Sequence, residues 1–134
     1  MPGYKKLNLK QDVENMAPKF GIEGLESRFA REALGLEVSG VSYFRLDPDA
    51  RTPFGHRHGE QEEVYVLLSG SARLAVDDEV VELQPFDAVR VSGPMTRCLE
   101  GGPEGAEMLA FGSPSHGNKD AEMIPGWWAG ESST

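Results

Sequence analysis

The sequence predicts an all-β fold, an antiparallel sandwich or barrel, over residues 25–111. Short apolar segments recur through this region, and turn signals rich in glycine, proline and aspartate separate them. The absence of intervening helical segments favours antiparallel pairing of the strands. The strands are expected within residues 38–44, 63–69, 72–76, 80–83, 88–91, 96–100 and 106–111.

The turns between these strands are marked by residues that favour a tight reversal of the backbone. Residues 46–49 (Leu-Asp-Pro-Asp) end the first strand, and Gly70 closes the second. Residues 77–79 (Asp-Asp-Glu) are typical of a hairpin turn. The later strands are separated by residues 85–87, 93–94 and 101–103.

The two ends of the chain differ from this central region. Apolar residues at helical spacing, with Gly21 as a stop signal, predict a short helix over residues 11–20, although Pro18 would kink or end it. Residues 113–134 are rich in serine, glycine and proline and are predicted to form a tail, which Trp127 and Trp128 would pack onto the barrel or onto a neighbouring subunit. We therefore expect an N-terminal segment (1–24), a barrel (25–112) and a C-terminal tail (113–134).

Length and charge limit the classes of function. The 134 residues suit one domain, and the net charge of −9 comes from 22 acidic against 13 basic residues. This balance argues against binding to nucleic-acid phosphates and to anionic membrane surfaces, because both need clustered lysine and arginine. Cys98 is the only cysteine, so no disulfide can form within the chain. Without a secretory signal or a long apolar segment, the protein is expected to be cytoplasmic.

Candidate site residues lie within residues 54–63 (Phe-Gly-His-Arg-His-Gly-Glu-Gln-Glu-Glu). His56 and His58 are two positions apart, so on a strand both imidazoles point to the same face, as two ligands of one metal require. A carboxylate from the next strand would complete a set of two histidines and one carboxylate, which leaves open positions on a metal. The alternative is an exposed His-Arg-His turn beside an acidic loop.

The spacing around these histidines resembles the first motif of the cupin superfamily. His56-x-His58 is followed after four residues by Glu63 and after six more by Gly70. Glu63 alone satisfies both gaps, whereas Glu62 would point to the opposite face of its strand and, like the nearby Glu60, is expected to be solvated. Residues 64–70 (Val-Tyr-Val-Leu-Leu-Ser-Gly) are similar to the strand and turn that follow the family's glutamate, and residues 83–87 to its inter-motif turn, with Phe86 where glycine is usual.

The resemblance covers residues 40–112 and has several implications. It implies a double-stranded β-helix, or jelly-roll, barrel with a site inside it. It also implies that His56, His58 and Glu63 converge there as ligands of a divalent metal such as Fe, Mn, Ni or Zn. Cupins often form dimers. The strand around residues 64–68 is apolar on both faces and needs a second cover, so we expect a homodimer.

The second cupin motif departs from the family pattern. With the alignment fixed at Gly93, Thr96 stands where a third histidine is expected, and a hydroxyl is a poor ligand for most transition metals. Three alternatives follow. The protein binds a metal through three ligands only, it recruits Cys98 or His116 as a further ligand, or it has lost the metal and binds a small molecule directly.

Two kinds of function fit these residues. One is a metal-dependent enzyme acting on a small organic substrate, with Tyr65, on the same strand face as Glu63, as the candidate for proton transfer. The other is a non-catalytic binding protein, a sensor or carrier, whose apolar interior holds a small molecule. In both cases the expected partner is a small molecule.

Overall fold

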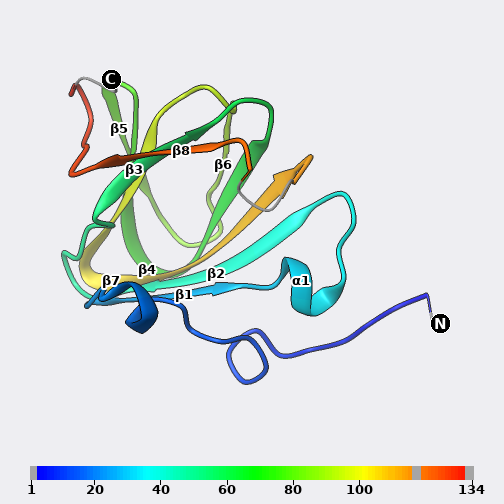
Figure 1. Ribbon diagram of the computed structural model, residues 1–134. Helices are drawn as coiled ribbons and strands as arrows, with labels where there is room; N and C mark the ends of the chain where they lie inside the picture. Colours follow the sequence, from blue (N-terminus) through cyan, green and yellow to red (C-terminus); the bar gives the residue numbers. More distant parts are fainter. Residues whose placement is uncertain (1–2, 116–118, 132–134) are drawn as a thin grey trace.

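The computed structural model describes residues 3–115 and 119–131. Its strands form one curled antiparallel sheet, as Figure 1 shows, and the prediction of an all-β barrel is confirmed. The strands are β1 (Leu25–Phe29), β2 (Gly40–Leu46), β3 (Phe54–His58), β4 (Glu62–Val76), β5 (Glu79–Leu83), β6 (Ala88–Val91), β7 (Arg97–Ser113) and β8 (Ala121–Pro125).

Two long bent strands hold the barrel together. β7 pairs with β2, β3 and β4, and β4 pairs in addition with β5 and β6. The turn predicted at Gly70 is a bend within β4, where the register with β7 shifts on both sides of that residue. Such irregularities bend a strand and increase its twist. The glycines at residues 101–102 likewise lie inside β7, so two pairs of predicted strands are each one continuous strand.

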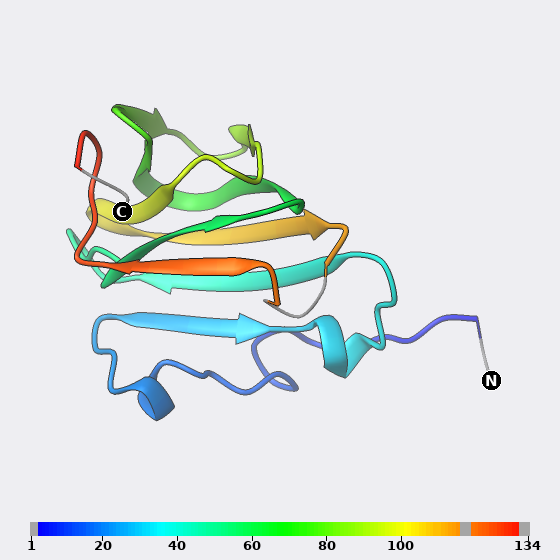
Figure 2. The same cartoon turned by 45° about the horizontal axis from the view of Figure 1, so that its top comes forward.

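The helix expected over residues 11–20 is absent apart from a 3-10 turn, η1 (Pro18–Phe20). Pro18 is at the start of this turn, where its missing N–H is tolerated, and Gly21 ends it in a left-handed conformation (φ 68°). The preceding residues bond to β1 instead, because the Met16 N–H donates to the Ser27 carbonyl and Asn15 Oδ1 accepts the Ser27 N–H. Figure 2 shows this N-terminal segment running beside β1 at the edge of the sheet. The short helix α1 (Arg31–Leu34) was not expected.

The interior of the barrel is filled by alternating residues of the long strands. Leu67, Leu74 and Met108 have no exposed surface, and Tyr65 and Leu46 are 2% exposed. Burial of this apolar surface is the main source of stability in a domain of this size. The core therefore fixes which faces of β4 and β7 point inward, and with them the side chains of the site.

The segment predicted to be a tail contributes a strand and an anchor. β8 pairs along β3 from Phe54↔Pro125 to His58↔Ala121. Trp127 is 2% exposed and packs against Gly55, where an added Cβ would lie 2.7 Å from its ring. The expectation that Trp127 packs this segment onto the barrel is met. The division of the chain at residues 24 and 112 stays a prediction.

Among the described residues, none of the helices has the length and apolar character needed to cross a membrane.

We predict that the protein is a homodimer. Val64, Val66 and Leu68 on β4 are only half-buried, and Phe111, which pairs with Val64, is 43% exposed. A partner copy would cover this apolar surface. Light scattering at micromolar concentration should give about twice the chain mass of 14.6 kDa. A mass of one chain would contradict the dimer and leave the fold unaffected.

Candidate metal site

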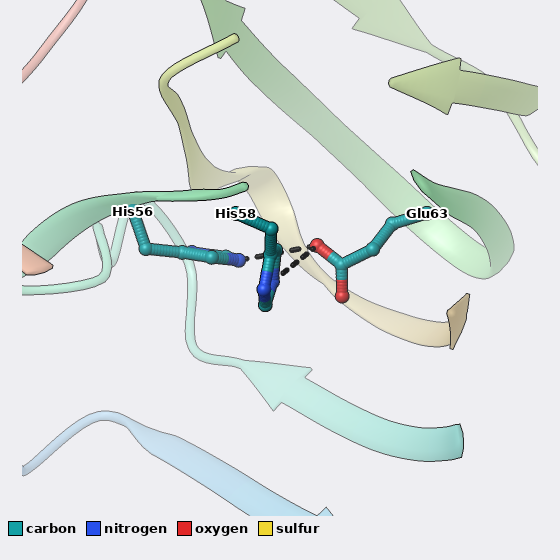
Figure 3. A group of neighbouring side chains, drawn as sticks. All are labelled: His56, His58 and Glu63. Carbon is teal, nitrogen blue, oxygen red and sulfur yellow. Dashed lines mark hydrogen bonds and ion pairs between the residues drawn. The ribbon is translucent and has the colours of Figure 1, made fainter. Parts of the chain in front are cut away.

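The structure brings His56, His58 and Glu63 together inside the barrel (Figure 3). The two histidines come from β3, and Glu63 comes from the start of β4. His56 Nε2 lies 3.1 Å and His58 Nε2 3.5 Å from Glu63 Oε1. One potential ligand atom from each residue lies within 4.8 Å of the other two. The side chains therefore converge on one point, as their spacing predicted.

The alternation of the two strands produces this convergence. The imidazole rings of His56 and His58 are 5.2 Å apart and point to the same side of β3, whereas Arg57 between them reaches Glu122 Oε2 at 2.7 Å. On β4, Glu62 forms an exposed ion pair with Arg90, and its neighbour Glu63 turns inward. The expectation that Glu62 points away from the site is met.

His58 is held in place by Asp120, which sequence reasoning missed. His58 Nδ1 lies 2.9 Å from Asp120 Oδ1, and Asp120 Oδ2 accepts the backbone N–H groups of Glu60 and Gln61. A carboxylate on one ring nitrogen fixes the ring and directs the other nitrogen toward the ligand position. In this case Nε2 faces Glu63. Asp120 stands 62 residues from His58 in the chain, and nothing in the sequence pattern connects them.

Glu63 is the centre of the polar group. Besides its contacts with the two histidines, its Oε1 accepts a hydrogen bond of 2.8 Å from the Tyr65 hydroxyl. Burial raises the pKa of Glu63, but the hydrogen bonds of His56 and His58 and the charge of Arg97 outweigh it, so the pKa lies well below its ordinary value. The carboxylate is therefore ionised and able to act as a ligand.

The pKa values of the neighbouring groups shift in the opposite direction. Burial lowers the pKa of His58, but hydrogen bonds to Glu63 and Asp120 outweigh it and place the pKa above its ordinary value. Burial and the charge of Glu63 raise the pKa of Tyr65 well above its ordinary value, against the charge of Arg97. Tyr65 is thus a hydrogen-bond donor, and its proton is held more tightly than that of a free tyrosine.

The assignment of Thr96 to the third histidine position is wrong by one residue. Arg97 is the residue that faces the site. Its Cα is paired with that of His56, its side chain is completely buried, and its Nη2 lies 3.5 Å from Glu63 Oε1. Thr96 instead lines a separate cavity with Asp77 and Trp127. Neighbouring residues of an extended chain point to opposite faces, so a shift of one position in the alignment selects the wrong side chain.

Cys98, another candidate ligand, does not join the group. Cys98 is buried against Ala75 and Trp127, and its sulfur lies 2.9 Å from Thr52 Oγ1. Burial raises the pKa of this thiol, and a metal binds the thiolate form. Cys98 is therefore a small apolar residue of the core. His116 lies outside the described residues.

Residues 42–100 match the family model described as "Cupin domain". With the curled antiparallel sheet and the site inside it, this decides the family. The chain is a cupin. A cupin protein from Bacteroides fragilis has a similar structure, with a TM-score of 0.70 and 25% identity over 87% of this chain and 89% of the other.

Two further solved structures with this fold are more distant in sequence. A single-residue variant of oxalate decarboxylase from Bacillus subtilis has a TM-score of 0.72 at 21% identity, and the alignment spans 88% of this cupin but only 32% of the enzyme. A variant of PAC13 from Streptomyces, determined with uridine, has a TM-score of 0.72 at 15% identity over 96% and 94% of the two chains. At these identities the likeness establishes the fold alone. No curated protein matches the sequence.

The donor set of this cupin fits a divalent transition metal in most respects. Two imidazole nitrogens and one carboxylate oxygen converge, and Asp120 orients one of the rings, as is typical of metal-binding histidines. Arg97 opposes a metal at this site. Its permanent positive charge stands where a fourth ligand would stand, so the affinity for a cation must be lower than in a site with a third histidine.

Proposed function

We propose that this cupin binds a small organic ligand inside its barrel and that His56, His58 and Glu63 hold a divalent metal as part of this site. The observation that carries the proposal is the convergence of the three side chains on one point. The orientation of His58 by Asp120 supports it, because a carboxylate on one ring nitrogen directs the other nitrogen toward the ligand position, as in metal-binding histidines. Fe, Mn, Ni and Zn all accept such donors.

A metal held here would supply a Lewis acid with open positions for the ligand. The protein side chains have separate roles around it. Tyr65 donates a hydrogen bond to Glu63 and keeps that carboxylate turned inward. His56, with 26% of its side chain exposed, links the group to solvent, whereas His58 and Arg97 are enclosed. A ligand would therefore enter beside His56.

A second candidate function, a metal-free site that binds the small molecule directly, is favoured by Arg97. Its guanidinium supplies a fixed positive charge 3.5 Å from Glu63 Oε1, a charge that a metal supplies in other sites. Two of the similar structures are relevant to both candidate functions. One is named as an oxalate decarboxylase, and the other is a complex with uridine. Both names describe proteins that take small molecules, which supports a ligand in the interior of this barrel.

Metal content separates the two candidates. Protein purified without a histidine tag and loaded with Mn²⁺ or Zn²⁺ should retain about one ion per chain after dialysis, measured by elemental analysis. His56→Ala and His58→Ala should each lose the ion, because each removes one of the three ligands found among the described residues. Arg57→Ala, on the same strand but directed at Glu122, is the matched control and should retain it.

The contrary result is equally clear. If the wild-type protein binds neither ion in calorimetry, the metal centre is refuted and the metal-free candidate stands. If Arg57→Ala loses the ion together with the two histidine variants, the loss comes from damage to β3, and the assignment of the ligands is not supported.

A further inference from the structure

Arg97 carries hydrogen-bond donors that the described part of the protein leaves unused. The side chain has no exposed surface. Its Nη1 donates to the carbonyls of Gly93 and Met95, at 3.0 and 2.9 Å, which fixes the guanidinium in position. Nε and Nη2 have no hydrogen-bond partner among the described residues. A buried hydrogen-bond donor without an acceptor is costly even where an ion pair balances its charge, as Glu63 does at 3.5 Å, so these two atoms indicate that a further group belongs beside them.

The unused atoms are adjacent on the guanidinium. The N–H groups of Nε and Nη2 on one edge of this plane are parallel, and this edge matches the two oxygens of a carboxylate. Glu63 does not occupy it, because Oε1 is 3.5 Å from Nη2 and already accepts the Tyr65 hydroxyl at 2.8 Å. We propose that Arg97 binds the carboxylate of the small-molecule ligand through this edge. The inference rests on a ligand inside the barrel, as proposed above, and not on the metal.

The charges around Arg97 select the class of anion. The completely buried Arg97 guanidinium lies beside the Glu63 carboxylate, with Nη2 3.5 Å from Oε1. A single negative charge on the ligand can be stabilised by the guanidinium, whereas a doubly charged phosphate would be repelled more strongly by Glu63. A neutral ligand would leave Nε and Nη2 without an acceptor of comparable strength. The ligand is therefore a monocarboxylate at this end, small enough to pass His56.

Acetate and its neutral isostere acetamide test the proposal. The full chain, freed of metal with EDTA, is titrated with each compound while the Nε–H signals of its arginines are followed by NMR. Acetate should shift the Arg97 signal, and acetamide should bind about tenfold more weakly or not at all. Inorganic phosphate is the third probe and should bind more weakly than acetate.

Variants assign the effect to Arg97. Arg97→Met should weaken acetate binding by about tenfold or more, and Arg97→Lys should lose part of the affinity because lysine keeps the charge without the paired donors. Arg90→Met, at an exposed position on β6, should bind as the wild type does. If Arg97→Met does not fold, the titrations of the wild type and of Arg97→Lys still test whether Arg97 binds the carboxylate.

Three results would overturn the inference: equal binding of acetate and acetamide, an unchanged Arg97 signal at saturating acetate, or unchanged acetate affinity in Arg97→Met. Tighter binding of phosphate than of acetate would overturn the assignment to carboxylates. Because metal-free protein is used, failure of the metal centre leaves these outcomes unaffected. A protein that binds metal but not acetate would refute the inference alone.

Discussion

Replacing Arg97 by histidine should raise the affinity of the site for Zn²⁺ or Mn²⁺ by at least about a hundredfold. The substitution removes a buried positive charge that lies 3.5 Å from Glu63 Oε1 and puts a neutral imidazole in its place. Two unit charges about 4 Å apart interact by roughly 4 kcal/mol at the effective dielectric of a protein, and the repulsion of a divalent ion is larger. The new imidazole would also add a fourth ligand. Calorimetric titration of wild type and Arg97→His measures the difference.

Thr96→His is the matched control for this experiment. Thr96 is as deeply buried as Arg97 but lines the cavity beside Asp77 and Trp127, so a histidine there should leave the affinity of the site unchanged. An increase in Thr96→His, with none in Arg97→His, would restore the alignment based on Gly93. Equal affinities in the wild type and in Arg97→His would show that the guanidinium does not act on the site.

The part of the site that could be predicted is the part encoded by short-range spacing. His56 and His58 share a strand face because of the two-residue period, and Glu63 and Gly70 follow at fixed distances within one strand and its bend. Residues so close in sequence keep their relation in any barrel of this kind. The same period explains why Tyr65 was placed on the face of Glu63, where its hydroxyl indeed donates to that carboxylate.

The features that could not be predicted depend on long-range pairing. Asp120 reaches His58 only because β8 pairs with β3. The residues of β8 had been predicted to belong to a tail, because their composition did not indicate a strand. Arg97 was not placed at the third histidine position because the alignment of its segment was fixed at Gly93, and an error of one residue exchanges the inner and outer faces of a strand. The prediction of a helix over residues 11–20 was wrong for a related reason. The apolar spacing of this segment does bury Val13 and Ala17, but the Met16 N–H donates to Ser27 of β1 and does not continue a helix.

Gly70 is the position where a substitution should damage the fold most. Its φ is 79°, a backbone conformation that residues other than glycine adopt at a cost of about 1–2 kcal/mol. An added Cβ would lie 2.0 Å from the carbonyl oxygen of Gly105 on β7, so the backbone of one strand would have to move. The contact occurs where β4 bends between its two irregularities in register. The residue that marks the end of the cupin motif therefore also determines how closely β4 and β7 approach.

We expect Gly70→Ala to lower the free energy of unfolding by about 3–5 kcal/mol, a large part of the stability of a domain this size. Gly126→Ala is the matched control. Gly126 has a similar φ of 70°, but nothing lies within 4 Å of its Cβ position, so only the cost of the backbone conformation, about 1–2 kcal/mol, should appear. Urea denaturation followed by tryptophan fluorescence measures both. Equal losses in the two variants would show that the β4–β7 contact at Gly70 adds nothing beyond backbone strain.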